Sequence, residues 1–167
     1  METLTQNGKS YKILVVSDSH RDQYTLEKII KKEADANLII HLGDGIDEFE
    51  DLMLYTRKNN ISVKGNSDTD SISHSDIKTV TVCDKKLFLS HGHIFNVKDK
   101  YDDIIKNARA ENADLCLFGH THMQHISTVD GMTVLNPGAV YSLQQYAVIK
   151  ITDGNIHAEL KCLKGNA

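Results

Sequence analysis

The first 64 residues alternate between short apolar runs and stripes of apolar residues at helical spacing. The apolar runs, Tyr11 to Ser17, Leu38 to His41 and Ile61 to Lys64, predict buried strands. Between them, Asp22 to Asp35 and Asp47 to Arg57 predict amphipathic helices. The residues expected on their buried faces are Leu26, Ile29, Ile30 and Ala34 in the first, and Phe49, Leu52, Met53 and Tyr55 in the second. This alternation predicts parallel strands joined by crossover helices.

After Asp70 the pattern changes to paired strands. Ile77 to Val82 and Leu87 to Ser90, with a turn at Asp84-Lys85-Lys86, predict a hairpin that begins a second sheet. A third helix is expected over Asp99 to Asn112, before a strand at Leu115 to Phe118. The rest of the chain predicts four strands, His125 to Val129, Met132 to Asn136, Tyr141 to Thr152 and Asn155 to Leu163, with hairpin turns at Asp130-Gly131 and Asp153-Gly154.

Length and composition predict one globular domain over residues 1–167. The chain is 40% apolar and 25% charged, and its net charge of -4, with scattered lysines and arginines, shows no nucleic-acid footprint. No apolar stretch is long enough to span a membrane. Met1 to Ser10 lacks the apolar segment of a secretory signal, so a cytoplasmic location is expected. Three separated cysteines, Cys83, Cys116 and Cys162, are expected to be reduced thiols.

Five short motifs place metal-binding side chains at or just after predicted strand ends. Ligands collect at the carboxyl ends of strands in open α/β sheets, so these side chains should meet at one edge. Where the backbone stays extended, residues two apart project to the same side, so Asp18 with His20, and His120 with His122, should point into one cavity. The motifs are Asp18-Ser19-His20, Gly43-Asp44, Gly65-Asn66-Ser67-Asp68, His91-Gly92 and Gly119-His120-Thr121-His122. Two carboxylates, one amide and four imidazoles predict a site for two divalent cations.

The ordered set D-x-H, G-D, G-N-x-D, H-G and G-H-x-H resembles the calcineurin-like metallophosphoesterase superfamily. The short length and Asn136-Pro137-Gly138 are similar to its small YfcE-like phosphodiesterase branch. The resemblance implies an α/β fold, a four-layer α/β/β/α sandwich of two mixed sheets flanked by helices. It also implies a metal-dependent phosphodiesterase that hydrolyses phosphoester bonds with a metal-bridging hydroxide at a dinuclear site.

The resemblance further implies which residues hold the metals. One ion would be bound by Asp18, His20 and His122 and the other by Asn66, His91 and His120, with Asp44 bridging the two; Asp44, Asn66 and His91 are the candidate catalytic residues. Mn²⁺ is the metal expected from the family likeness, while imidazole-rich sites also accept Zn²⁺, Fe²⁺ or Ni²⁺.

One position departs from the family. Many superfamily phosphatases carry a His after the Asn of G-N-H-[DE], and this chain has Ser67, whose hydroxyl is a poor general acid near neutral pH. We therefore expect small phosphodiesters with acidic leaving groups, such as aryl esters, to be the readily detected substrates. Asp68, His93 and Asn136 are expected to contact substrate or to support the ligands. A homodimer or tetramer is expected in solution.

The main alternative is a non-catalytic interaction scaffold with a vestigial metal site. The resemblance also covers the retromer subunit VPS29, which uses this fold as a binding scaffold. In that relative the ligand set is eroded, whereas this chain keeps all seven candidate ligands, which favours the enzyme. A third interpretation, metal storage or sensing, has no dedicated sequence support.

Overall fold

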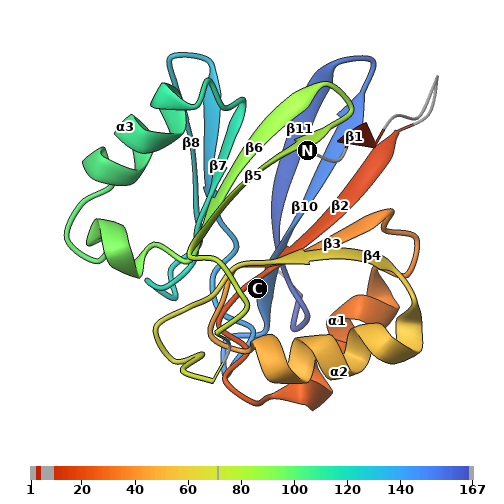
Figure 1. The fold of residues 1–167 in the computed structure, drawn as a ribbon. Coiled ribbons are helices and arrows are strands. Elements are labelled where there is room, and N and C mark those ends of the chain that lie inside the picture. The colour runs from red at the N-terminus through yellow and green to blue at the C-terminus, as the bar shows by residue number, and fades with distance from the viewer. Residues whose placement is uncertain (1–2, 5–9, 71, 166–167) are drawn as a thin grey trace.

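A computed structural model describes residues 3–4, 10–70 and 72–165, and shows two sheets with helices on their outer faces (Figure 1). Most of Met1 to Ser10, the stretch expected to lack a secretory signal, lies outside the described residues. The helices are α1 (Gln23–Lys32), α2 (Ile46–Thr56) and α3 (Asp102–Ala110), with a short 3₁₀ helix at His93–Phe95. Among the described residues, no helix has both the length and the apolar character needed to cross a bilayer.

The first sheet has five strands in the order β11-β10-β2-β3-β4. Its parallel part, β2 to β3 to β4, is connected through α1 and α2, as the alternating pattern predicts. The hairpin β10–β11 returns from the C-terminus and pairs antiparallel with β2. The bounds are β2 (Tyr11–Val16), β3 (Leu38–His41), β4 (Asn59–Ser62), β10 (Gln145–Thr152) and β11 (Asn155–Cys162).

The second sheet has six strands in the order β1-β5-β6-β7-β9-β8 and mixes both pairing directions. The hairpin β5–β6 is antiparallel, whereas β6, β7 and β9 run parallel, with α3 between β6 and β7 in the chain. The bounds are β1 (Thr3–Leu4), β5 (Ile77–Val82), β6 (Lys85–Ser90), β7 (Leu115–Leu117), β8 (His125–Val129) and β9 (Met132–Asn136). The predicted four-layer α/β/β/α sandwich is confirmed.

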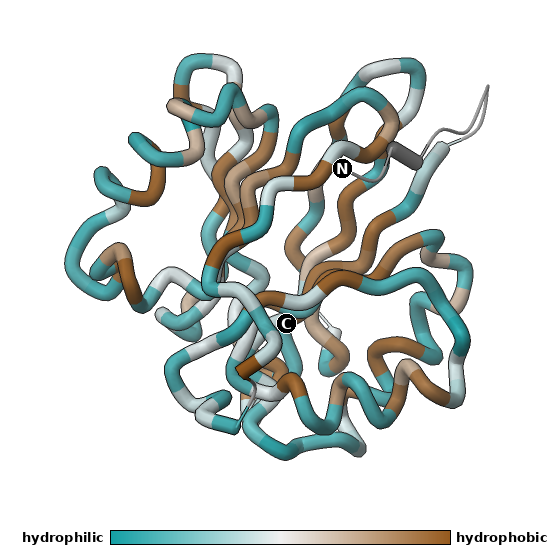
Figure 2. The backbone as a smooth tube through the Cα atoms, viewed as in Figure 1, coloured by the Kyte–Doolittle hydropathy of each residue, from teal (hydrophilic) through white to brown (hydrophobic). Residues whose placement is uncertain are grey.

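Side-chain alternation along the strands divides the apolar residues into three layers. On β2, Ile13 and Val15 face the core between the sheets, while Leu14 and Val16 face α1 and α2. A third cluster packs α3 on the six-stranded sheet through residues such as Ile104 and Phe118. Figure 2 shows the apolar residues along the strands and polar residues on the outer turns. The packed core therefore fixes the positions of the strand ends from which the loops begin.

Several local predictions are wrong or shifted. Tyr141 to Gln144 forms a turn, so β10 starts at Gln145. The third helix starts at Asp102 rather than at Asp99, and β4 lies two residues earlier than predicted. Tyr55 was expected to be available for burial, but its exposed fraction is 84%, because it lies on the solvent face of α2. The hairpin turn is at Cys83-Asp84, so Lys85 and Lys86 already belong to β6.

Candidate metal centre

The loops after β2 and β3 are hydrogen-bonded to each other beyond the ends of the strands. The amide of Asp18 donates to the carbonyl of Gly43 and the amide of His20 donates to the carbonyl of Asp44, both at 3.0 Å. The loop after β7 joins them, because the amide of His120 donates to Asp18 Oδ2 at 3.0 Å. Motifs that lie about 100 residues apart in the chain therefore meet at one edge.

Asp18 is completely buried, and its two carboxylate oxygens have different surroundings. Oδ2 accepts the Ser17 hydroxyl at 2.8 Å in addition to the amide of His120. Oδ1 has no hydrogen-bond partner among the described residues and faces three imidazole nitrogens: Nε2 of His122 at 3.2 Å, of His20 at 3.6 Å and of His91 at 3.8 Å. Burial opposes ionisation of Asp18, but the adjacent imidazoles outweigh it and hold its pKa far below the usual value.

Asp44 and His91 form the second half of the site. Asp44 Oδ1 accepts the amide of Ser67 at 2.8 Å, which leaves Oδ2 free, 3.2 Å from His91 Nε2 and 3.8 Å from His20 Nε2. Nδ1 of His91 is 2.7 Å from the Leu42 carbonyl. Because a carbonyl can only accept, Nδ1 carries the proton, and Nε2 of a neutral His91 points its lone pair at the site.

Two groups of three side chains could each hold an ion, because the ligand atoms within each group lie within 4.8 Å of one another. Together the two groups contain six of the seven predicted ligands. One group is Asp18, His20 and His122; the other is Asp44, His91 and His120. In the first group the Nε2 atoms of His20 and His122 are 3.3 Å apart. The seventh predicted ligand, Asn66, lies exposed in the turn of residues 65–68, beside Ser67, whose amide contacts Asp44.

The paired ligands converge through left-handed backbone, not through the extended backbone that the sequence analysis assumed. The φ angles of Asp18, His20, His120 and His122 are +55°, +40°, +70° and +58°. The assumption of extended backbone is wrong, and at Asp18, His20 and His120 the backbone amides donate to neighbouring loops where the chain turns. Positive φ in residues with a β-carbon costs free energy and is concentrated at functional sites.

Gly43 allows the loops to approach closely. It has φ of +99°, and a β-carbon there would lie 2.6 Å from the amide nitrogen of Gly65 and 2.9 Å from Nδ1 of His91. A side chain at this position would therefore push apart the loops that carry Asp44 and His91.

Asp68 and Asn136 stabilise the loops that carry the predicted ligands and are not themselves in either ligand group. The Asp68 carboxylate accepts four backbone amides, those of Asp44, Gly45, Ile46 and Gly65, at 2.6 to 3.1 Å. It thus joins the loop after β4 to the start of α2. Asn136 is buried, and its amide nitrogen donates to the Gly119 carbonyl at 2.9 Å and to Thr121 Oγ1 at 3.0 Å. Both residues fix the backbone beside predicted ligands.

A buried chain of polar side chains supports His20, and the sequence analysis did not single it out. Glu48 Oε1 accepts the Ser19 hydroxyl and the amide of Arg21, both at 2.7 Å, so one carboxylate holds both neighbours of His20. The Ser19 hydroxyl is also 2.9 Å from Nε2 of His41, whose Nδ1 accepts the Gly43 amide. Complete burial lowers the pKa of His41 to about 4. In the sequence, Glu48 looks like any polar residue of an amphipathic helix, so no local signal identifies it.

His93 borders the second group of ligands. Its ring centroid is 5.5 Å from that of His91 and 6.2 Å from that of His120, and its Nε2 lies 3.8 Å from Asp76 Oδ1. Burial lowers the pKa of His93, and burial lowers that of His120 to about 4, with a further contribution from the charges of His91 and Lys98. Both rings are therefore neutral at pH 7, the form in which imidazole binds metals.

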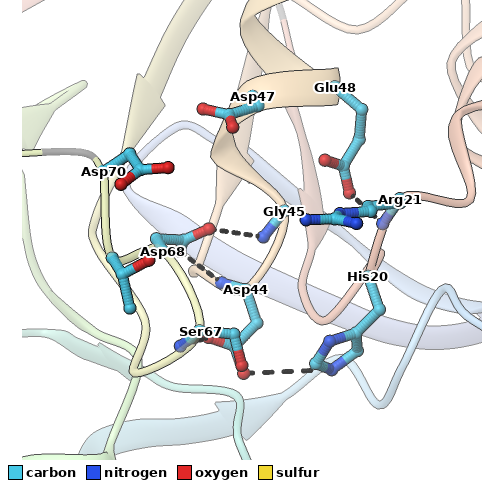
Figure 3. Close-up of a pocket in the computed structure, with 10 residues that line it drawn as sticks. His20, Arg21, Asp44, Gly45, Asp47, Glu48, Ser67, Asp68 and Asp70 are labelled. Carbon is cyan, nitrogen blue, oxygen red and sulfur yellow. Dashed lines mark hydrogen bonds and ion pairs between the residues drawn. The ribbon is translucent and has the colours of Figure 1, made fainter.

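The donor set fits divalent metal ions. Asp18 Oδ1 and His91 Nε2 are buried, lack hydrogen-bond partners among the described residues and point into the same space. Buried polar atoms without partners are costly, and a cation between the carboxylates and imidazoles would satisfy them. A cavity of about 340 Å³ opens beside them, lined by His20, Arg21, Asp44, Gly45, Asp47, Glu48, Ser67, Asp68, Thr69 and Asp70 (Figure 3).

The fold and this centre define a metallophosphoesterase. Residues 11–154 match the family described as the calcineurin-like phosphoesterase superfamily domain, and the chain belongs to that family. Within it, the relatives place the chain in the small YfcE-like branch.

Two curated relatives illustrate this placement, and two solved structures share the fold. The chain is 31% identical over 133 residues to the probable metallophosphoesterase YsnB of Bacillus subtilis, covering 77% of this chain and 74% of that protein. It is 28% identical over 148 residues to the phosphodiesterase MJ0936 of Methanocaldococcus jannaschii, covering 76% and 82%. A predicted phosphoesterase from Streptococcus pneumoniae has the same fold, with a TM-score of 0.78, 22% identity and coverage of 95% and 93%. So does Vacuolar Protein Sorting 29 of Cryptosporidium parvum, with a TM-score of 0.71, 16% identity and coverage of 91% and 97%.

Proposed function

We propose that this phosphoesterase is a phosphodiesterase that requires two divalent metal ions, and that Mn²⁺ is the preferred metal. The observation that carries the proposal is the pair of buried atoms without partners, Asp18 Oδ1 and His91 Nε2, each within a separate group of potential ligands. Each group supplies one carboxylate and two imidazoles, which is enough to hold an ion of its own. The choice of Mn²⁺ rests on family likeness together with the oxygen ligands.

The proposed assignment divides the ligands between the ions. Asp18, His20 and His122 would hold one ion, and Asn66, His91 and His120 would hold the other. Asp44 would be shared by the two ions, because its Oδ2 faces both His91 of one group and His20 of the other. Asn66, which is exposed in the turn beside Ser67, would supply an amide oxygen to the second ion. When bound, such a pair of ions lowers the pKa of water and offsets the charge of a phosphate.

The protein's own part is to orient these ligands and to admit the substrate. The Leu42 carbonyl keeps the Nε2 lone pair of His91 directed at the centre, and the Ser67 amide fixes which oxygen of Asp44 stays free. Ser67 lines the adjacent cavity but supplies no efficient general acid. This favours diesters whose leaving groups need no protonation, such as aryl esters.

The test is hydrolysis of an aryl phosphodiester by the purified protein with Mn²⁺. We expect turnover that is lost on chelation, restored by Mn²⁺, and reduced at least about 100-fold in Asp44→Asn, because loss of a direct ligand should exceed the 10- to 100-fold effect of supporting residues. Asp51→Asn, an exposed aspartate of α2, is the matched control and should retain activity.

The same experiment addresses the scaffold alternative. The structures of VPS29 share the fold, but likeness at 16% identity carries no information on activity. A protein that binds two Mn²⁺ ions per chain and hydrolyses neither aryl diesters nor monoesters would contradict the proposed function and support the scaffold. Calorimetric titration with Mn²⁺ gives the stoichiometry independently of turnover.

A further inference from the structure

Two pockets with different charge border the metal centre. The cavity of Figure 3, here called the acidic pocket, lies at the loops of the five-stranded sheet, and five of its ten lining residues are Asp or Glu, with Arg21 the single cation. A second cavity of about 480 Å³, here called the lysine pocket, is lined by residues 97–101, Thr121 and Met123. The two share no lining residue, and the lysine pocket carries Lys98 and Lys100 against one acidic residue, Asp99.

The lysine pocket is attached to the metal centre through Thr121. This residue lies between His120 and His122, and its hydroxyl accepts the Asn136 side-chain amide at 3.0 Å and the Met123 backbone amide at 3.1 Å. The wall that Thr121 and Met123 form is therefore fixed relative to the predicted ligands. A group bound in this pocket would stay at a constant distance from a phosphate on the metals.

Lys98 is held near the centre by the residue that precedes it. Val97 is buried and lies against Gly92, where an added β-carbon would come within 2.7 Å of Val97 Cγ2. The segment that carries Lys98 thus packs on the loop of His91. Lys98 is also close enough to His120 for its charge to act on that imidazole.

Neither lysine of this pocket forms an ion pair with the part of the chain that the structure describes. Among the described ranges, no carboxylate oxygen lies within 4.0 Å of Lys98 Nζ or Lys100 Nζ, whereas Lys12, Lys31 and Lys161 each have an acidic partner. Val97, Tyr101 and Met123 provide apolar surface beside these charges. An apolar wall with free ammonium groups suits an organic group that ends in an anion.

We propose that the lysine pocket binds an additional anionic group, a carboxylate or a second phosphate, on one of the two esterified arms of the phosphodiester substrate, with Lys98 as the residue that recognises it. This inference rests on the proposed function and narrows its substrate class. The acidic pocket repels such an anion and takes the other, uncharged arm. The substrate is therefore an asymmetric diester that binds in one orientation.

The test compares two analogues that are not hydrolysed at the relevant bond, methyl 4-carboxybenzylphosphonate and methyl 4-carbamoylbenzylphosphonate. They differ only in the terminal anion, and their binding to the Mn²⁺-loaded protein is measured by calorimetry. We expect the natural chain to prefer the carboxylate about fivefold, the gain of a partly exposed ion pair. Lys98→Met should abolish the preference without changing the dissociation constant of the carboxamide, and Lys98→Glu should reverse it. A third analogue ending in a phosphate shows which anion is bound more tightly.

The control is Lys106→Met, an exposed lysine of α3 outside this pocket, which should keep the fivefold preference. Equal binding of the two benzylphosphonates to the natural chain, or an unchanged preference in Lys98→Met, would overturn the proposal while leaving the phosphodiesterase intact. If neither compound bound the Mn²⁺-loaded protein and no diester were hydrolysed, the proposed function itself would fail.

Discussion

Replacement of Glu48 by alanine tests whether the buried polar chain behind His20 positions the metal centre. Glu48 is 7% exposed, and its Oε1 accepts the Ser19 hydroxyl and the Arg21 amide. Glu48→Ala removes the acceptor oxygen that the two donors share and leaves both donors near the site without it. His20, held between them, then loses its fixed position.

The magnitude follows from the two hydrogen bonds. Each bond to a charged acceptor contributes about 1.5 to 3 kcal/mol, and the two are not additive because they share one oxygen. We expect the metal-free variant to lose about 3 kcal/mol of unfolding free energy. Because His20 is a predicted ligand, Mn²⁺ affinity should fall about 10- to 100-fold. Glu48→Gln keeps an acceptor oxygen and should restore part of both losses.

The assays are guanidinium unfolding of the chelated protein and calorimetric titration with Mn²⁺. Glu50→Ala is the matched control, since Glu50 is an exposed neighbour on α2 whose partner, His74, lies outside the candidate centre. If Glu48→Ala unfolded at the same denaturant concentration as Glu50→Ala and bound Mn²⁺ as the natural chain does, the positioning role would be refuted.

Three further predictions concern separate features. Ser67→His should supply a general acid and raise the rate for alkyl esters relative to aryl esters, and an unchanged aryl-to-alkyl rate ratio would contradict this. Glu33 is buried against Lys12, Lys161 and Tyr146, and although burial opposes its ionisation, these partners lower its pKa from 4.5 to about 2. Glu33 therefore contributes about 3 kcal/mol to the free energy of unfolding above pH 4.5, and this contribution is lost as the pH falls toward 2. Glu33→Gln should remove this pH dependence of the unfolding free energy, which denaturant unfolding at several pH values measures. The chain should be a homodimer or tetramer, and a monomeric mass in solution scattering would refute that.

Most elements of the fold were predictable because their apolar patterns are local. The alternating apolar run Ile77–Val82 is an observed strand with the predicted bounds, and so is Leu38–His41. The Tyr141 to Gln144 turn was missed because its sequence continues the apolar character of β10. Its backbone is instead set by distant partners, since the amides of Val140 and Tyr141 donate to the carbonyls of Ser17 and Asp18. Such bonds have no signature in the segment itself.

The sequence alone predicted the kinds of candidate ligand and their place after the strands, because parallel strands bring their carboxyl ends to one edge. Only the tertiary structure decided how those side chains point. Hydrogen bonds between loops hold Asp18, His20 and His120 in left-handed backbone, and His122 is left-handed as well, unlike the extended geometry that spacing suggested. The support from Glu48 and the two pockets of unlike charge likewise arise from contacts between segments far apart in the chain. Residue type and order are local properties, whereas side-chain direction in a loop depends on whatever the rest of the fold packs against it.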